Sequence, residues 1–122
     1  MIKKTITYVD YDGNERTEDC YFNFSKAELV EMNLSTEGGL EAKLRKIIEE
    51  KDTAKIVELW KKILLDAYGI KSEDGRRFIK SEEISKEFSQ TEAYSNLFME
   101  LSFDEEKAIE FVNGVIPKNL EK

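Results

Sequence analysis

Apolar and polar side chains alternate in two segments of the first two dozen residues. The apolar positions that share one face are Ile2, Ile6 and Tyr8 in the first segment and Cys20, Phe22 and Phe24 in the second. Between the segments, Asp12-Gly13 favours the positive φ values that a tight hairpin turn needs. The pattern predicts a β-hairpin over residues 1–24. Its apolar face must pack against the rest of the chain, because a lone hairpin is marginally stable in water.

From residue 25 onward the apolar positions recur with the period of an α-helix. Helices are predicted over residues 26–34, 40–50 and 53–68, followed by about three more between residues 81 and 116. The residues expected to cap these helices at their N-termini are Ser25, Asp52, Ser81, Ser89 and Ser102. A glutamate follows three residues after Ser25, Ser89 and Ser102, which completes a capping box at each of these positions.

The segment between the two groups of helices has the composition of a second turn. Gly69 is expected to end the preceding helix in the left-handed backbone conformation. Asp74-Gly75 then predicts a tight turn, across which Ile70 and Phe78 would face each other.

These elements predict an α+β fold that is mainly α-helical, with an N-terminal β-hairpin followed by about six helices. One domain would cover residues 1–117. Its parts are the hairpin 1–24, the helices of 25–68, the turn 69–80 and the helices of 81–116, with a tail over 118–122. A chain of 122 residues is long enough to bury a core without metal or disulfide bonds.

Composition narrows the possible functions. The chain carries 19 Lys and Arg against 26 Asp and Glu, a net charge of −7, and it has no histidine and one cysteine. The commonest general base and metal ligand is therefore missing, and most hydrolase and zinc mechanisms are excluded with it. No apolar run is long enough to span a bilayer, and the N-terminus lacks the apolar stretch of a secretory signal, so we expect no membrane association.

Three local patterns could suggest chemistry, and each has a simpler explanation. The acidic residues near Asp10 resemble a calcium loop, but their spacing fits a hairpin turn better. The acids that follow Ser102, from Asp104 to Glu106, are those that a helix N-terminus favours. Cys20 has no histidine to activate it and lies on the inward side of a strand, as a buried apolar residue does. We therefore expect no enzyme activity and no catalytic, metal-binding or cofactor-binding residues.

One cluster of basic residues lies in the turn that contains Asp74-Gly75. Its members are Lys71, Arg76, Arg77 and Lys80, with Phe78 among them. Glu73 and Asp74 lie in the same segment, and a chain of net charge −7 lacks the positive field that supplies most of the affinity for nucleic acids. We therefore expect no nucleic-acid partner.

Aromatic residues of the C-terminal helices could form either the core or a groove for a partner helix. Composition alone favours the core. Apolar residues outside the main stripes, Leu65, Met99 and the second stripe of the first helix, favour a partner surface. The predicted contact face consists of Phe88, Tyr94, Phe98, Met99 and Leu101. Leu29 and Met32 are predicted to mediate self-association, so we expect a homo-oligomer.

Several motifs in the second half of the chain occur together in a known protein family. They are Ala67-Tyr-Gly-Ile-Lys71, Ser72-Glu-Asp-Gly-Arg-Arg-Phe78, Phe88, Thr91, Ala93-Tyr94, Leu97-Phe98, Phe111-Val-Asn113 and Ile116-Pro117. This half of the chain resembles the tail assembly chaperones of long-tailed, siphophage-type bacteriophages that infect Gram-positive hosts. The N-terminal half fits the layout of that family but carries no distinctive motif of it.

The resemblance implies a non-enzymatic role in phage tail assembly. Such proteins coat the long helical tape measure protein and keep it soluble until tail-tube subunits polymerise around it. They self-associate, and a longer form made by translational frameshifting often accompanies the short one. The resemblance places the chain in the cytoplasm of the infected or lysogenic host and outside the mature virion. The alternative is a structural tail or neck component of the particle.

The distribution of charge along the chain predicts which side chains a client helix should carry. Residues 81–116 contain two basic and nine acidic residues, whereas residues 1–80 are close to neutral, with 15 basic and 16 acidic residues. The acidic surplus therefore lies on the helices that carry the predicted contact face. An acidic rim around an apolar groove suits a client helix flanked by lysine and arginine.

Overall fold

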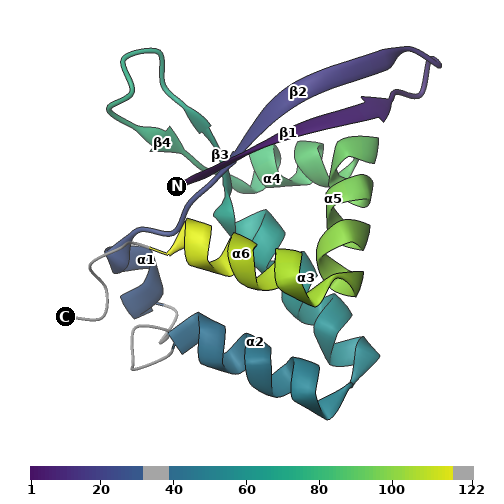
Figure 1. Cartoon of the computed structure of the whole chain (residues 1–122). Coiled ribbons are helices and arrows are strands. Elements are labelled where there is room, and N and C mark those ends of the chain that lie inside the picture. The colour runs from purple at the N-terminus through teal and green to yellow at the C-terminus, as the bar shows by residue number, and fades with distance from the viewer. Residues whose placement is uncertain (32–38, 117–122) are drawn as a thin grey trace.

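The computed structural model describes residues 1–31 and 39–116, in which four strands and six helices confirm the α+β prediction (Figure 1). In chain order the elements are β1 (Ile2–Val9), β2 (Glu15–Phe22), α1 (Lys26–Glu31), α2 (Gly39–Glu50), α3 (Thr53–Ala67), β3 (Tyr68–Lys71), β4 (Phe78–Ile79), α4 (Glu82–Ser89), α5 (Glu92–Phe103) and α6 (Glu105–Val115). The predicted tail 118–122, together with Met32 and Pro117, lies outside the described residues. None of the described helices is long and apolar enough to cross a membrane.

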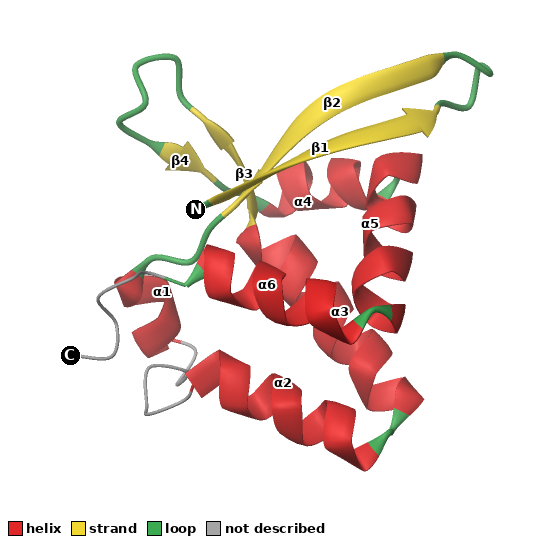
Figure 2. Ribbon diagram, in the orientation of Figure 1, coloured by secondary structure: helices red, strands yellow, loops and turns green. Residues whose placement is uncertain are grey.

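The strands form one antiparallel sheet in the order β1-β2-β3-β4, and the helices lie on one side of it (Figure 2). The N-terminal hairpin pairs without interruption from Ile2 opposite Phe22 to Val9 opposite Glu15. The alternation predicted from the sequence is confirmed, because the side chains of Ile6 and Tyr8 on β1 are buried beneath the sheet while their neighbours are exposed.

The hairpin turn is organised by Asp10. Its Oδ1 accepts hydrogen bonds from the amides of Asp12 and Asn14, each at 2.9 Å, and its Oδ2 lies 2.6 Å from Nε of Arg16. Gly13 has φ of 83°, whereas Asp12 is not left-handed, so only one residue of the predicted pair needs the special conformation. The carboxylate of Asp10 is thus used by the turn itself, which favours the turn over a calcium loop.

Two predictions about the second turn were wrong. Gly69 is not left-handed, because α3 passes directly into β3 and Gly69 is a strand residue. A Cβ there would lie 2.6 Å from the Phe78 ring, so the glycine serves a close approach between strands. The register also differs by one residue: Ile70 pairs with Ile79 and Lys71 with Phe78, because the six-residue turn closes with a hydrogen bond from the Ser72 amide to the Arg77 carbonyl.

Three predicted helix caps are confirmed, and two lie elsewhere. Ser25, Asp52 and Ser81 each accept a hydrogen bond from the amide three residues on. Thr91, not Ser89, caps α5, and Asp104, not Ser102, caps α6, with acceptor distances of 3.2 Å in both cases. Ser89 and Ser102 instead lie in the last turns of α4 and α5, because these helices continue through them and the next helices begin two residues later than the capping-box pattern predicted.

This difference gives the first testable prediction. Thr91→Ala should lower the free energy of unfolding by about 1 kcal/mol, because it removes the side-chain acceptor for the Tyr94 amide. The matched control is Ser89→Ala, which removes a hydroxyl in the last turn of α4 that donates to the Lys86 carbonyl and does not cap the start of α5. Urea denaturation monitored by circular dichroism should place this control within about 0.5 kcal/mol of the wild type. A larger loss in the control than in Thr91→Ala would contradict the observed cap.

The core lies between the inner face of the sheet and helices α3 to α6. Phe22 is at its centre, with its ring 5.7 Å from those of Tyr68 and Phe88 and 5.3 Å from that of Phe111. Trp60 of α3 packs edge-on against Phe111 at 5.8 Å. These edge and tilted arrangements are those that aromatic rings prefer. The core joins the hairpin, the central helix α3 and the C-terminal helices into one packed unit.

Candidate functional site

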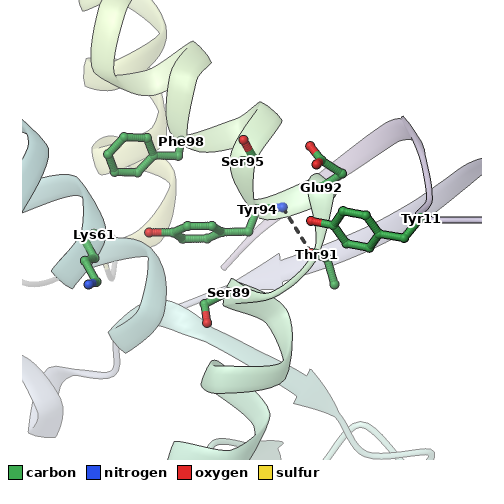
Figure 3. A pocket seen from close by; sticks show the side chains of 8 residues that line it. All are labelled: Tyr11, Lys61, Ser89, Thr91, Glu92, Tyr94, Ser95 and Phe98. Atoms are coloured by element: carbon green, nitrogen blue, oxygen red, sulfur yellow. Dashed lines mark hydrogen bonds between the residues drawn. The ribbon is translucent and has the colours of Figure 1, made fainter.

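A surface groove crosses the junction of the hairpin turn with α3, α4 and α5 (Figure 3). Its volume is about 450 Å³, and it is lined by Tyr11, Lys61, Ser89, Thr91, Glu92, Tyr94, Ser95 and Phe98. Tyr94 points from α5 across the groove toward Lys61 of α3, while Glu92 lies beside Tyr11 (Figure 3). The groove therefore has aromatic rings along its length and a charge of opposite sign toward each end.

The aromatic rings of the groove continue a row that begins in the core. Tyr68 stacks on the buried Phe88 at 4.0 Å, Phe88 meets Tyr94 edge-on at 5.6 Å, and Tyr94 lies 5.8 Å from Phe98. The Thr91 cap fixes the first turn of α5 and with it the position of Tyr94. Because the inner rings are packed, the half-buried outer rings are held in place before any partner binds.

The hairpin turn contributes the residue that sequence patterns missed. Tyr11 is 76% exposed, yet it closes one end of the groove beside Glu92. Local desolvation and the neighbouring Glu92 carboxylate both raise the pKa of Tyr11 above its ordinary value. A bulky aromatic residue among the polar residues of a turn was the only signal for this role in the sequence.

The structure divides the predicted contact face into two groups. Phe88 and Leu101 are buried in the core, so they support the surface from beneath and are not available to a partner in this conformation. Tyr94 and Phe98 lie together in the groove. Met99 is 53% exposed on the adjoining side of α5. The apolar stripe of α5 is wide, and its period alone does not indicate which part the other helices cover.

Helix α5 also exposes an apolar residue that the sequence analysis did not select. Phe103 is 67% exposed in the last turn of α5. With Ser95 and Met99 it occupies positions four residues apart, so the three share one side of the helix. This strip borders the groove through Ser95, which belongs to both.

The residues predicted for self-association do not form a described surface. Leu29 of α1 is fully buried in the core, and Met32 lies outside the described residues. Leu65, selected as a stray apolar position, is half-buried, and its carbonyl accepts a hydrogen bond from Ser85 Oγ of α4 at 2.8 Å. Self-association remains a prediction, and the buried Leu29 offers no surface for it in this conformation.

The candidate reactive groups among the described residues have structural roles. Burial, with the nearby Glu18 and Asp19, raises the pKa of the Cys20 thiol to about 11, which keeps it protonated and unreactive. Asp104 caps α6 with one carboxylate oxygen, and Glu105 and Glu106 lie in its first turn, where the helix dipole favours them. Among the residues that the structure describes, no three potential ligands are grouped to hold a metal ion.

Comparison with known proteins identifies the family. Residues 1–122, the whole chain, match the family described as phage tail assembly chaperone. No significant match was found among curated proteins or among solved structures. The match extends the resemblance noted in the second half of the sequence to the N-terminal hairpin, and the role of the family is assembly rather than catalysis. The chain belongs to the phage tail assembly chaperone family.

Proposed function

We propose that the protein binds the tape measure protein of its phage and keeps this helical client soluble while the tail assembles. The observation that carries the proposal is the groove, in which Tyr94 and Phe98 present half-buried rings at the surface of a tail assembly chaperone. Rigid aromatic side chains in a recess are the usual anchors for an apolar partner helix. The protein acts within the infected host cell and leaves before the virion is complete.

The charges of the groove specify what the client helix should carry. Glu92 at one end favours a lysine or arginine of the client, and Lys61 at the other end favours an acidic residue. The acidic surplus of residues 81–116 extends the preference for basic flanks over the surrounding surface. Each contact is weak, and repetition along a long client replaces tight binding at one site.

Substitution in the groove tests this proposal. Phe98→Asp places a charge among the aromatic rings and should reduce the soluble fraction of co-expressed tape measure protein by about tenfold, since burying an unpaired carboxylate costs well over 1 kcal/mol. Asn96→Asp is the matched control, because it adds the same charge to an exposed position of the same helix. Soluble and insoluble tape measure protein are quantified by immunoblotting.

A second variant separates binding from folding. Phe98 also packs against the core, so Phe98→Asp can weaken the fold, whereas Tyr11 is exposed and Tyr11→Ala should leave the melting temperature unchanged. Tyr11→Ala should still lower client solubility, by severalfold. If both groove variants keep the client as soluble as the wild type does, the groove is not the client site.

A further inference from the structure

The first strand of the sheet has a free edge. β1 is the terminal strand in the order β1-β2-β3-β4 and pairs only with β2 among the described elements. The amide of Asp10 donates to the Asn14 carbonyl at 2.9 Å, so these two residues form a hydrogen-bonded pair. Hydrogen-bonded and non-hydrogen-bonded pairs alternate along an antiparallel ladder, so every second residue of β1, counted back from Asp10, bonds to β2. Lys3, Thr5, Thr7 and Val9 therefore direct their backbone N–H and C=O groups away from β2, and no described backbone group bonds to them.

This edge has no bulge and no proline, two of the features that usually block strand addition. The β1–β2 pairing runs through eight successive residue pairs, so no bulge twists the edge away. Residues 2–9 contain no proline, and after Lys3 and Lys4 the run Thr5–Val9 is uncharged and rich in β-branched residues. On the outer face, Thr5 donates to Asp19 at 2.7 Å and Thr7 bonds Thr17 at 3.0 Å, which holds the strand regular.

We propose that the occupant of this edge is a second copy of the chain, paired β1 to β1 in antiparallel orientation about a two-fold axis at Ile6. In this register Thr5 lies opposite Thr7 of the partner subunit, and Lys3 lies opposite Val9. Each of the four outward residues then exchanges backbone hydrogen bonds with its counterpart. The two sheets join into one, and self-association has a surface that the buried Leu29 does not supply.

The register follows from the side chains on the inner face. Centring on Ile6 brings two buried apolar side chains together and places Lys4 opposite Tyr8 of the partner subunit, whose hydroxyl donates to Glu18 at 2.6 Å. If the two-fold axis passed through Thr5 instead, the ammonium of Lys4 would lie against Ile6 of the partner subunit. If one strand slid along the other by a single residue, the apolar face of one copy would turn toward solvent. Lysine never faces lysine in the Ile6 register, so like charges do not oppose pairing.

A proline at the edge tests the pairing. Thr7→Pro removes an outward N–H and should convert a dimer into a monomer in sedimentation equilibrium, raising the dissociation constant at least about 100-fold. Thr17→Pro is the matched control, because it loses the same contact between Thr7 and Thr17. The N–H that it removes points away from β1, and it lies beyond the part of β2 that pairs with β3, which is limited to Tyr21 and Phe22. It should remain dimeric. A monomeric wild type at about 100 µM, or equal masses for the two variants, would overturn the proposal.

Cross-linking tests the register in proteins with the edge intact. Cys20 is buried with a raised pKa, so an introduced cysteine is the reactive one. A mixture of Thr5→Cys and Thr7→Cys proteins should form a disulfide-linked dimer faster than either protein alone. Faster linkage of Thr5→Cys alone would overturn the Ile6 register. The pairing does not involve the groove, so its failure leaves the client proposal unaffected.

Discussion

Phe22→Ala should lower the free energy of unfolding by about 3–5 kcal/mol, because it empties the space where β2 meets β3, α4 and α6. The ring is fully buried and contacts three other aromatic rings at 5.3 to 5.7 Å, each of which loses a partner. For a domain of this size the loss corresponds to a melting temperature lower by about 10–20 °C. Urea and thermal denaturation monitored by circular dichroism measure both quantities.

The same substitution at an exposed site supplies the control. Phe103 is 67% exposed, so Phe103→Ala should change the free energy of unfolding by less than about 0.5 kcal/mol. Equal losses in the two variants would mean that the observed core is not the one that stabilises the fold.

Lys80→Met should destabilise the protein by about 2 kcal/mol at neutral pH. The Lys80 ammonium donates to the Asn23 carbonyl at 2.7 Å and to Glu28 Oε2 at 2.6 Å, and it lies 5.1 Å from the centre of the Phe24 ring. It therefore joins the end of β2, the start of α1 and β4. Methionine keeps the length of the side chain but leaves the half-buried Glu28 carboxylate without its cation. Lys86→Met, on the exposed side of α4, is the matched control.

The pH dependence identifies the ion pair as the cause. Burial alone would raise the pKa of Glu28, but the hydrogen bonds from Lys80 and from the Ser25 amide outweigh it and hold the pKa below its ordinary value of 4.5. A lowered carboxyl pKa contributes stability that is complete above this ordinary value and is lost as the pH falls through the folded-state pKa. The difference between wild type and Lys80→Met should therefore shrink from about pH 7 to about pH 3. A constant difference would assign the loss to packing.

The sequence was a good guide wherever one local pattern determines the structure. The alternation around Ile6 and Phe22 identified the buried face of the hairpin, and Ser25 and Asp52 capped their helices as expected. Ser89 failed as a cap because Thr91 competes two residues later, and a capping box is only a spacing of residue types. Gly69 failed because its role comes from the Phe78 ring on another strand, which no local pattern reveals.

The candidate site was less accessible to sequence reasoning because it is assembled from distant segments. Tyr11 and Tyr94 line one groove although more than 80 residues separate them. Helical period placed Phe88, Phe98 and Leu101 on apolar stripes, but it could not tell which of these the other helices cover. Phe103 lies in the last turn of α5, where predicted helix ends are least certain.

Recovery of the protein with its partners from infected cells tests the central claim most directly. A tagged copy of the protein, purified from infected cells that are collected before the phage lyses them, should bring down the tape measure protein as its main partner in mass spectrometry. The Phe98→Asp copy should recover much less of it than the Asn96→Asp copy does, and purified virions should lack the protein. Recovery of the protein in stoichiometric amounts from purified virions, without tape measure protein in the pre-lysis complex, would contradict the account and identify a structural tail or neck component.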